Sequence, residues 1–258
     1  MHSVTPSSNL ATSGTSGGDV KIGNLAGDLL PPEFAWAEID AENAPESTVT
    51  DGRVARGLRT RRNVAEALIE LLREGDPEPT ARAVAQRAGV SLRLVFHHFT
   101  EMDDLYHYVA ALQLRRQWSE MPRVSSKLSL ATRLERTVAH RAALYEEISP
   151  IRRALVRRMP SSKGVTATIV AADGLLLENL KETFARELAA LATSSRLEVL
   201  DAMDVATSWE AWERLRTVSL LQVRGAKRVM TRMLEALCAP TLAARRGTHI
   251  GVPAVAVS

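Results

Sequence analysis

The chain has 258 residues, enough for one large domain or two of ordinary size, and its 45% apolar and 4% aromatic content favours a helical core over a sheet. The single cysteine, Cys238, excludes an internal disulfide, and no Cys or His grouping has zinc-finger spacing. The formal net charge of +3 is compatible with nucleic-acid binding but does not by itself establish it.

Residues 1–52 are predicted to be a disordered acidic extension, because they are low in complexity at first and then polar with scattered prolines. They hold one basic and eight acidic residues, a net of −7, which leaves 32 basic and 22 acidic residues in the remainder, a net of +10. They lack the basic head and apolar run of a signal peptide. No apolar run in the chain approaches the ~20 residues that cross a bilayer, so we expect a cytoplasmic protein.

The first predicted helix begins near Arg59 and ends at Gly75. Its apolar residues recur at i, i+4, i+7 and i+8, the pattern of an amphipathic helix, and a proline-containing loop follows. These apolar residues are Val64, Leu68, Leu71 and Leu72.

Three further helices are predicted before Pro122. Thr80 is placed to cap a short helix that ends at Gln86 or Arg87, and Ser91 is placed to cap another that ends at His97 or His98. A longer helix is expected to start near residues 101–104, where carboxylates suit a helix N-terminus.

Residues 128–237 are also expected to be helical, and no stretch shows convincing strand alternation. Prolines and a Thr-Ser-Ser run are expected to limit these helices. The predicted segments are a stripe over 134–145, a short helix over 151–159 between Pro150 and Pro160, a long helix over 169–188 broken at Thr193–Ser195, a helix from Leu197 to Leu215, and a last helix from Val223 to Pro240.

The informative stretch runs from Thr80 to Phe99, where Ala85, Gly89 and Val95 have the spacing of a helix-turn-helix motif. Two steeply crossing helices need a small residue at their closest approach, and the tight turn needs a residue that tolerates a positive φ. The residues expected to be buried are Val84, Val90, Val95 and Phe96, and those expected to face a major groove are Ser91, Leu92, Arg93, Leu94, His97 and His98. The same spacing also occurs in helix corners that bind no DNA, so the motif alone leaves both interpretations open.

From Arg59 to Leu105 the chain resembles the DNA-binding domain of the TetR (tetracycline-repressor-like) family of bacterial regulators. The features that carry the resemblance, in the family's order and spacing, are Arg61-Arg62, the amphipathic helix 64–72, Gly75, Thr80, Val84-Ala85, Ala88-Gly89-Val90-Ser91, Phe96-His97-His98-Phe99 and Leu105. The segment from Ser208 to Leu237 is similar to the last two helices of one branch of the family, which form the dimer in such proteins. The resemblance implies a homodimer that binds double-stranded operator DNA and responds to a small-molecule effector.

Two phosphate-contacting positions of the family pattern are changed in this chain. The usual Tyr is Phe96 and the usual Lys of the fourth helix is Met102, whereas Arg93 replaces the Gly or Pro common in the third helix. Because phosphate contacts supply much of the affinity for DNA, two alternatives stay open. Either other arginines compensate, or the chain is a helical dimer of the same fold that has lost specific DNA binding and acts as a ligand- or protein-binding module.

The motif and the resemblance together predict the residues that contact DNA. Arg93 is a candidate for a bidentate contact with a guanine edge or for a phosphate anchor, while Thr80 and Ser91 combine helix capping with a possible phosphate contact. The predicted DNA-binding residues are Arg59, Arg61, Arg62, Thr80, Arg82, Ser91, Leu92, Arg93, Phe96, His97 and His98.

The C-terminal half is expected to supply the dimer interface. Trp209 and Trp212 lie three residues apart on one helix face, where packing between subunits is favoured over a ligand pocket. Arg152, Arg153, Arg157 and Arg158 are expected to form a solvated face, and Glu210 and Glu213 to pair with Arg214 and Arg216 at the surface. The predicted interface residues are Val199, Met203, Trp209, Trp212, Met230, Met233 and Leu237.

The sequence therefore predicts an all-α protein with a three-helix helix-turn-helix domain followed by a helical dimerisation and ligand-binding domain. The predicted boundaries are 53–120 for the DNA-binding domain with its linking helix, 121–239 for the second domain and 240–258 for a flexible tail. The predicted function is a ligand-responsive transcriptional regulator that binds a palindromic operator as a dimer at the nucleoid, and the resemblance implies a repressor. No catalytic, nucleotide or metal motif is visible, so an enzyme, a cofactor and a metal are not expected.

Overall fold

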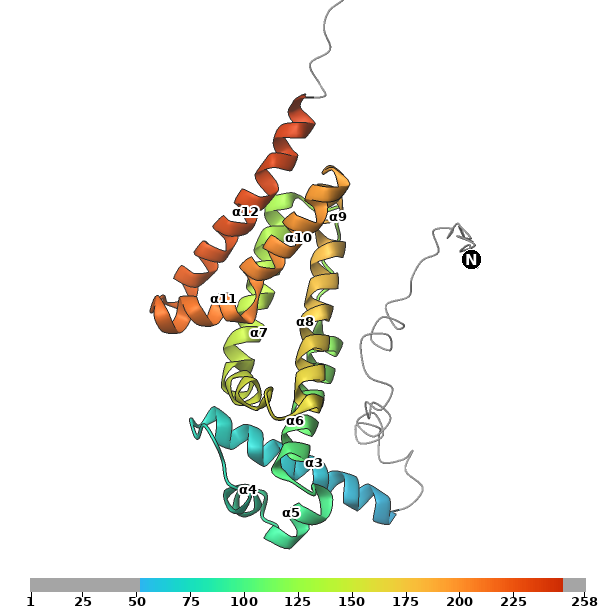
Figure 1. Ribbon diagram of the computed structural model, residues 1–258, viewed down its shortest axis with the longest axis vertical. Coiled ribbons are helices and arrows are strands. Elements are labelled where there is room, and N and C mark those ends of the chain that lie inside the picture. Colours follow the sequence, from blue (N-terminus) through green and yellow to red (C-terminus); the bar gives the residue numbers. More distant parts are fainter. Residues whose placement is uncertain (1–51, 248–258) are drawn as a thin grey trace, which may run out of the picture.

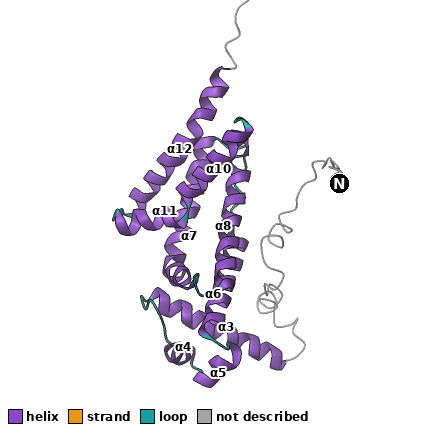
Figure 2. Ribbon diagram, in the orientation of Figure 1, coloured by secondary structure: helices purple, strands orange, loops and turns teal. Residues whose placement is uncertain are grey.

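The computed structural model describes residues 52–247, and within this range every regular element is a helix (Figure 2). The predicted all-α fold is therefore confirmed. The predicted disorder before Asp51 and the end of the predicted tail lie outside the described residues. The helices are α3 (Gly52–Arg73), α4 (Ala81–Ala88), α5 (Leu92–His98), α6 (Met102–Glu120), α7 (Leu130–Arg158), α8 (Lys163–Thr183), α9 (Ala185–Ala189), α10 (Thr193–Thr207), α11 (Trp209–Glu213), the π-helix η2 (Arg214–Val218) and α12 (Val223–Gly247).

The first helix, α3, starts at Gly52 and not near Arg59 as predicted. The prediction placed the start where the apolar periodicity begins, but Arg53, Ala55, Arg56 and Leu58 before it also favour a helix, and the helix continues through Gly57. The apolar stripe itself is confirmed from Val64 to Leu72, where the inward-facing side chains are buried.

The caps around α4 and α5 are confirmed. The Thr80 and Ser91 hydroxyls accept hydrogen bonds from the backbone N–H groups of Ala83 and Leu94, each at 3.2 Å. Gly89 ends α4 with φ of 67° and ψ of 30°, in the left-handed region that favours glycine. The turn between the two helices is thus fixed by local sequence.

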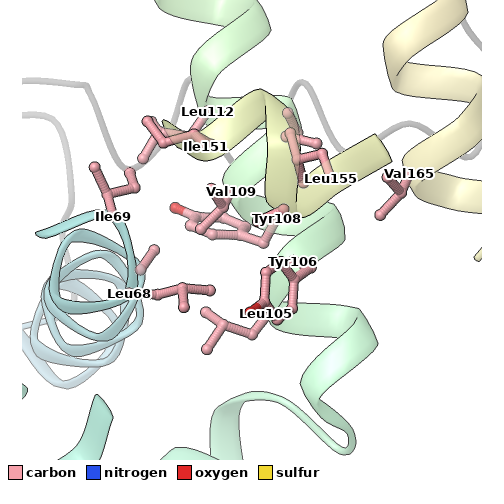
Figure 3. Close-up of a cluster of buried hydrophobic side chains, with 14 of the residues drawn as sticks. Leu68, Ile69, Leu105, Tyr106, Tyr108, Val109, Leu112, Ile151, Leu155 and Val165 are labelled. Carbon is pink, nitrogen blue, oxygen red and sulfur yellow. The ribbon is translucent and has the colours of Figure 1, made fainter. Parts of the chain in front are cut away.

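The long helix α6 starts with a capping box in which Glu101 and Asp104 bond reciprocally to the backbone. Its buried face joins α3 to the ends of α7 and α8 in one hydrophobic cluster, called here the first core (Figure 3). Tyr108 and Leu112 of α6, for example, belong to the same cluster as Ile69 of α3 and Ile151 of α7 (Figure 3). The predicted domain boundary at residue 120 remains a prediction, and the first core extends across it.

A close approach of α6 and α8 requires a glycine. A Cβ atom at Gly164 would lie 2.7–2.8 Å from ring atoms of His107, closer than side chains tolerate. The two helices therefore touch at this point through backbone and imidazole.

Helix α7 runs without interruption through Pro150, whereas a helix end was predicted there. A proline lacks the N–H that would bond the carbonyl four residues earlier, so it usually ends or kinks a helix. Figure 1 shows α7 bending, with its last turns seen almost end-on. The helix continues because Ile148 and Ile151, on either side of the proline, are both buried in the bundle.

Four other predicted limits in the C-terminal half are wrong. The helix predicted over 169–188 divides at Phe184 into α8 and α9, and Thr193–Ser195 begin α10 instead of forming a break. Ser208 separates α10 from α11, where its hydroxyl accepts from the N–H of Ala211 at 3.1 Å. Helix α12 continues past Pro240 to Gly247.

A second core fills the bundle formed by α7 to α12. Met203, Trp212 and Met230 have no exposed surface, and Trp209 is also buried. These four predicted interface residues pack inside the single chain, so as placed they have no surface with which to contact a second copy. Val199, Met233 and Leu237 are only partly buried and remain candidates.

Candidate nucleic-acid interface

Helices α4 and α5 form one end of the molecule, away from α12 (Figure 1). Val95, the inward-facing residue of α5, is 1% exposed and packs in the first core, together with Val84 of α4. The opposite side of α5 is open, with Ser91, Leu92, Arg93 and His97 all exposed. The face that was predicted to enter a major groove is therefore at the surface of the chain.

Contacts with α3 fix the orientation of this face. Ala85, the small residue at the crossing of α4 and α5, is buried, and its carbonyl accepts from the N–H of Val90 at 3.0 Å. The side-chain amide of Asn63 on α3 donates to the carbonyl of Ala88 at 2.9 Å. Because the end of α4 is held by α3, α5 is presented as a rigid element.

Phe96 is the exception among the residues predicted to be buried, since it is 45% exposed. It lies one residue after the inward-facing Val95, and so points away from the first core. It therefore belongs with the outward-facing residues and offers an apolar ring where the family pattern has a hydroxyl. The partly buried Val90 and Leu94 lie at the edge of the core.

The arginines predicted to bind DNA differ in how they are held. Arg59, Arg82 and Arg93 are exposed. Arg62 lies 3.8 Å from the carboxylate of Glu66, which also accepts from Arg116, so its charge is partly compensated.

Arg61 of α3 is partly buried, unlike the exposed arginines. Its guanidinium carbon is 5.3 Å from the centre of the Phe99 ring and 4.8 Å from the centre of the Tyr108 ring. Such stacking holds the side chain against the first core. Arg61 thus supports the end of α5 as much as it adds charge to the face.

The two histidines at the end of α5 stack edge-on, with ring centres 5.3 Å apart. Burial lowers the pKa of His98 below its usual value, and the nearby charges of His97 and Arg61 lower it further. His98 is therefore held in its neutral form. No group of three potential metal ligands occurs in the part of the chain described.

Thr80 and Ser91 keep a donor for an external anion. Each hydroxyl oxygen accepts one backbone hydrogen bond, which leaves its hydrogen available, and both residues are exposed. Capping and a phosphate contact are thus compatible in the same side chain.

Two arginines that the sequence analysis did not single out lie near this face. Arg53 and Arg56 are exposed on the first turns of α3, which project at the same end of the molecule as α5 (Figure 1). The spacing of three residues from Arg53 to Arg56 to Arg59 was the available signal, and it was missed because α3 was expected to begin later.

The predicted solvated arginine face on α7 is wrong for Arg152, whereas Arg157 is exposed as expected and the Arg153 side chain is 42% exposed. Arg152 is buried and contacts Asp173 at 2.7 and 2.9 Å, and Arg153 contacts Glu213 at 2.7 and 2.9 Å. Arg157 donates to the carbonyl of Pro77 at 2.6 Å. These arginines join helices to one another because each faces an acceptor on a neighbouring element.

The ion pairs predicted within α11 and η2 are formed with other partners than expected. Glu213 pairs with Arg153 of α7, and Arg216 pairs with Glu146 of α7 at 2.8 Å. Both pairs therefore anchor the α11–η2 segment to α7 instead of linking residues within it.

Residues 65–109, from α3 to the middle of α6, match the family model described as bacterial regulatory proteins of the tetR family. The match covers the whole helix-turn-helix and the start of the helix that leaves it. Residues 65–109 therefore form a DNA-binding domain of the TetR type, and the resemblance is confirmed for this part of the chain.

One solved structure shares this fold with a TM-score above 0.5. A transcriptional regulator from Rhodococcus sp. Rha1 is 15% identical, with a TM-score of 0.57 over 70% of this chain and 96% of that chain. A putative transcriptional regulator from Pseudomonas aeruginosa PAO1 is 18% identical, with a TM-score of 0.49 over 80% of this chain and 99% of that chain. No curated protein matches the sequence significantly. No helix in the described range is long and apolar enough to span a bilayer.

Proposed function

We propose that the chain is a TetR-family regulator that binds a palindromic DNA operator as a homodimer and represses transcription until a small molecule binds its C-terminal helices. The observation that carries the proposal is the open face of α5, which bears the exposed Arg93, while the preceding helix α4 bears the exposed Arg82. An exposed arginine on a rigid short helix is suited to a guanine edge in a major groove.

The phosphate contacts are assigned to groups around this face. Thr80 and Ser91 supply hydroxyl donors at two helix N-termini, and Arg53, Arg56 and Arg59 of α3 supply charge. These groups replace the hydroxyl and ammonium that Phe96 and Met102 lack. His97 and His98 are placed at the edge of the same contact.

Two copies are needed to read a palindrome, since two recognition helices related by a two-fold axis fit successive major grooves. The surfaces that support pairing are on α10 and α12. Leu197 and Val205 of α10 are 62% and 68% exposed. Val199 of the same helix is partly buried, and so are Met233 and Leu237 of α12. Apolar side chains exposed to this extent gain from burial against a second copy.

The link from ligand to DNA is proposed to run through α6. Three residues separate this helix from α5, and its buried face packs in the first core against α7 and α8. A ligand that favours a different position of α6 would change the spacing of the two α5 helices, and so shift the population away from the DNA-binding state.

The test is binding of the purified full-length chain to the DNA upstream of its own gene, measured by fluorescence anisotropy at several salt concentrations. We expect saturable binding that weakens steeply as salt rises, because several phosphates are neutralised. Binding that is absent, or equal for unrelated DNA of the same length, would favour the rival, a TetR-fold dimer without specific DNA binding.

A further inference from the structure

The helix-turn-helix and the first turns of α3 carry charge of one sign only. The chain has no acidic residue from Gly52 to Ala65, nor from Thr80 to Thr100. Apart from Arg87, which pairs with Glu74, the exposed arginines of these two stretches are Arg53, Arg56, Arg59, Arg82 and Arg93. A surface of this charge attracts carboxylates of a protein segment as well as phosphates.

The same surface exposes apolar side chains. Leu92 and Phe96 on α5 are 37% and 45% exposed, and Val54 on the first turn of α3 is 51% exposed. Phosphates make no use of these groups, whereas an apolar side chain that covers an aromatic ring removes both from water. The surface is therefore suited to a partner that combines carboxylates with apolar side chains.

The chain itself contains such a segment directly before α3. Residues 33–51, which lie outside the described residues, hold six acidic residues and no Lys or Arg. The acidic residues are Glu33, Glu38, Asp40, Glu42, Glu46 and Asp51, and Phe34, Trp36 and Ile39 lie among the first of them.

The segment is long enough to reach α5. Asn63 of α3 bonds to the end of α4 at Ala88, and the rise of a helix places it about 17 Å from Gly52 along α3. An extended chain covers this distance with about six residues. Because the segment is joined covalently to α3, its local concentration at this surface is far above that of a separate molecule.

We propose that residues 33–51 dock on the surface formed by α5 and the first turns of α3 of the same chain, and so compete with DNA for it. The carboxylates contact the exposed arginines, while Phe34, Trp36 and Ile39 cover Phe96 and Leu92. The competition with DNA rests on the proposed function, whereas the docking does not.

A second basic surface is the rival location for this segment. Helix α12 presents Arg224, Lys227, Arg228 and Arg232 along a shallow groove. Glu235 lines the same groove, and α12 lies away from the end of the molecule formed by α4 and α5 (Figure 1). The surface next to residue 51 is therefore favoured, and the test reads both surfaces.

The test compares the full-length chain with two variants of the segment. The charge variant replaces five carboxylates with amides and leaves Asp51 beside α3 unchanged: Glu33→Gln, Glu38→Gln, Asp40→Asn, Glu42→Gln and Glu46→Gln. The apolar variant keeps every charge: Phe34→Ser, Trp36→Ser and Ile39→Ser. Thermal melts establish that both variants fold.

Docking is measured without DNA, from the rate at which phenylglyoxal modifies single arginines, located by mass spectrometry. We expect Arg93 to react at least ~5-fold faster in both variants than in wild type, because the segment no longer covers it. Arg136 on α7, which is exposed elsewhere, should react equally in all three chains.

Three results would overturn the docking. Arg93 could react equally in all three chains, or faster in the charge variant alone, which would be a long-range effect of net charge. The segment could protect Arg228 of α12 instead of Arg93. Protection of Arg93 in wild type could disappear on dilution, which would mean that a second copy supplies the segment.

The consequence for DNA is measured separately by anisotropy. Both variants should bind operator DNA more tightly than wild type by the factor seen for Arg93, because only the undocked fraction of the chain binds. Protection of Arg93 without specific DNA binding by any chain would retain the docking and reject the proposed function. Specific binding of equal affinity and equal Arg93 reactivity in all three chains would retain the regulator and reject the docking.

Discussion

Arg93 is the residue on which DNA recognition is expected to depend most. Arg93→Ala should weaken operator binding by about 5- to 100-fold, the range of a lost base-edge or charged phosphate contact, because the side chain is exposed on the open face of α5. The melting temperature should not change, since no buried contact is removed. Anisotropy titrations and thermal melts measure the two effects.

Arg87 provides the matched control for Arg93. It lies in the same motif, but its two terminal nitrogens face Glu74 at 2.8 and 2.6 Å on the side of α3. Arg87→Ala should leave the affinity for DNA nearly unchanged. Similar losses for both variants would mean that affinity follows total charge and not the position of Arg93.

His140 of α7 should make stability depend on pH. Burial lowers its pKa from 6.5 to about 4, and the neighbouring Arg141 acts in the same direction. Between these two values the unfolded chain binds a proton that the folded chain does not. The stability contributed by neutral His140 is thus complete above pH 6.5 and is lost as the pH falls toward 4.

The comparison of wild type with His140→Gln isolates this effect, because both proteins share all other titrating groups. The loss of unfolding free energy between pH 7 and pH 4.5, measured by urea denaturation, should be smaller in the variant by about 1–2 kcal/mol, a value reduced for the partial exposure of the ring. Parallel pH profiles would show that His140 is protonated equally in both states.

At the scale of elements, the helix-turn-helix was predictable because its signals are local. The Thr80 and Ser91 caps and the left-handed Gly89 each depend on a few neighbouring residues, and they occur where the sequence placed them. The ends of the helices in the C-terminal half were not predictable from local signals. Pro150 and Pro240 remain within helices, because packing of the whole element outweighs the loss of one backbone hydrogen bond.

The end of α7 is tied to the helix-turn-helix by Arg158. Its guanidinium donates to Asp103 at 2.6 Å, lies 3.8 Å from the centre of the Tyr106 ring and contacts Glu78 at 3.4 Å. None of these contacts was expected, since the residues are far apart in sequence. The arginine run of α7 was predicted to form a solvated face, but Arg158 instead connects the end of α7 to α6 and to the loop before α4, and these contacts form a joint between the three elements.

Arg158→Ala should loosen this joint. We expect a loss of about 1–3 kcal/mol in unfolding free energy, because a partly buried charge pair and its ring contact are removed together. Hydrogen exchange should rise at the start of α6 and in the loop around Glu78. Arg136→Ala, an exposed position on the same helix, is the control. Unchanged exchange at both sites would show that the joint does not restrain α6.

At the scale of the whole molecule, the predicted dimer residues divide into two groups. Trp212 and Met230 fill the second core, as aromatic and sulfur-containing side chains at helical spacing commonly do. Sequence periodicity identifies an apolar face but not whether its partner is another helix of the chain or a second copy. The exposed apolar residues of α10 were therefore missed.

Substitutions of the exposed residues and of the buried residues should therefore have different effects on dimerisation and on stability. Val205→Asp should convert a dimer to monomers in sedimentation velocity without lowering the melting temperature of the chain, because Val205 is exposed. Trp212→Ala should cost about 3–5 kcal/mol of folding free energy, because the indole is fully buried. Retention of the dimer in Val205→Asp would move the pairing surface away from α10.

The first core has a further consequence for how the chain can be divided. A fragment ending at residue 120 would keep α3 to α6 but lose Ile151, Leu155 and Val165, leaving Tyr108 and Leu112 without the side chains that cover them (Figure 3). Such a piece should be soluble only poorly and melt without cooperativity. The helix-turn-helix segment is thus not an independently folding domain. Heating or ligand binding that alters the packing of α7 and α8 should therefore also alter the packing of α3 and α6.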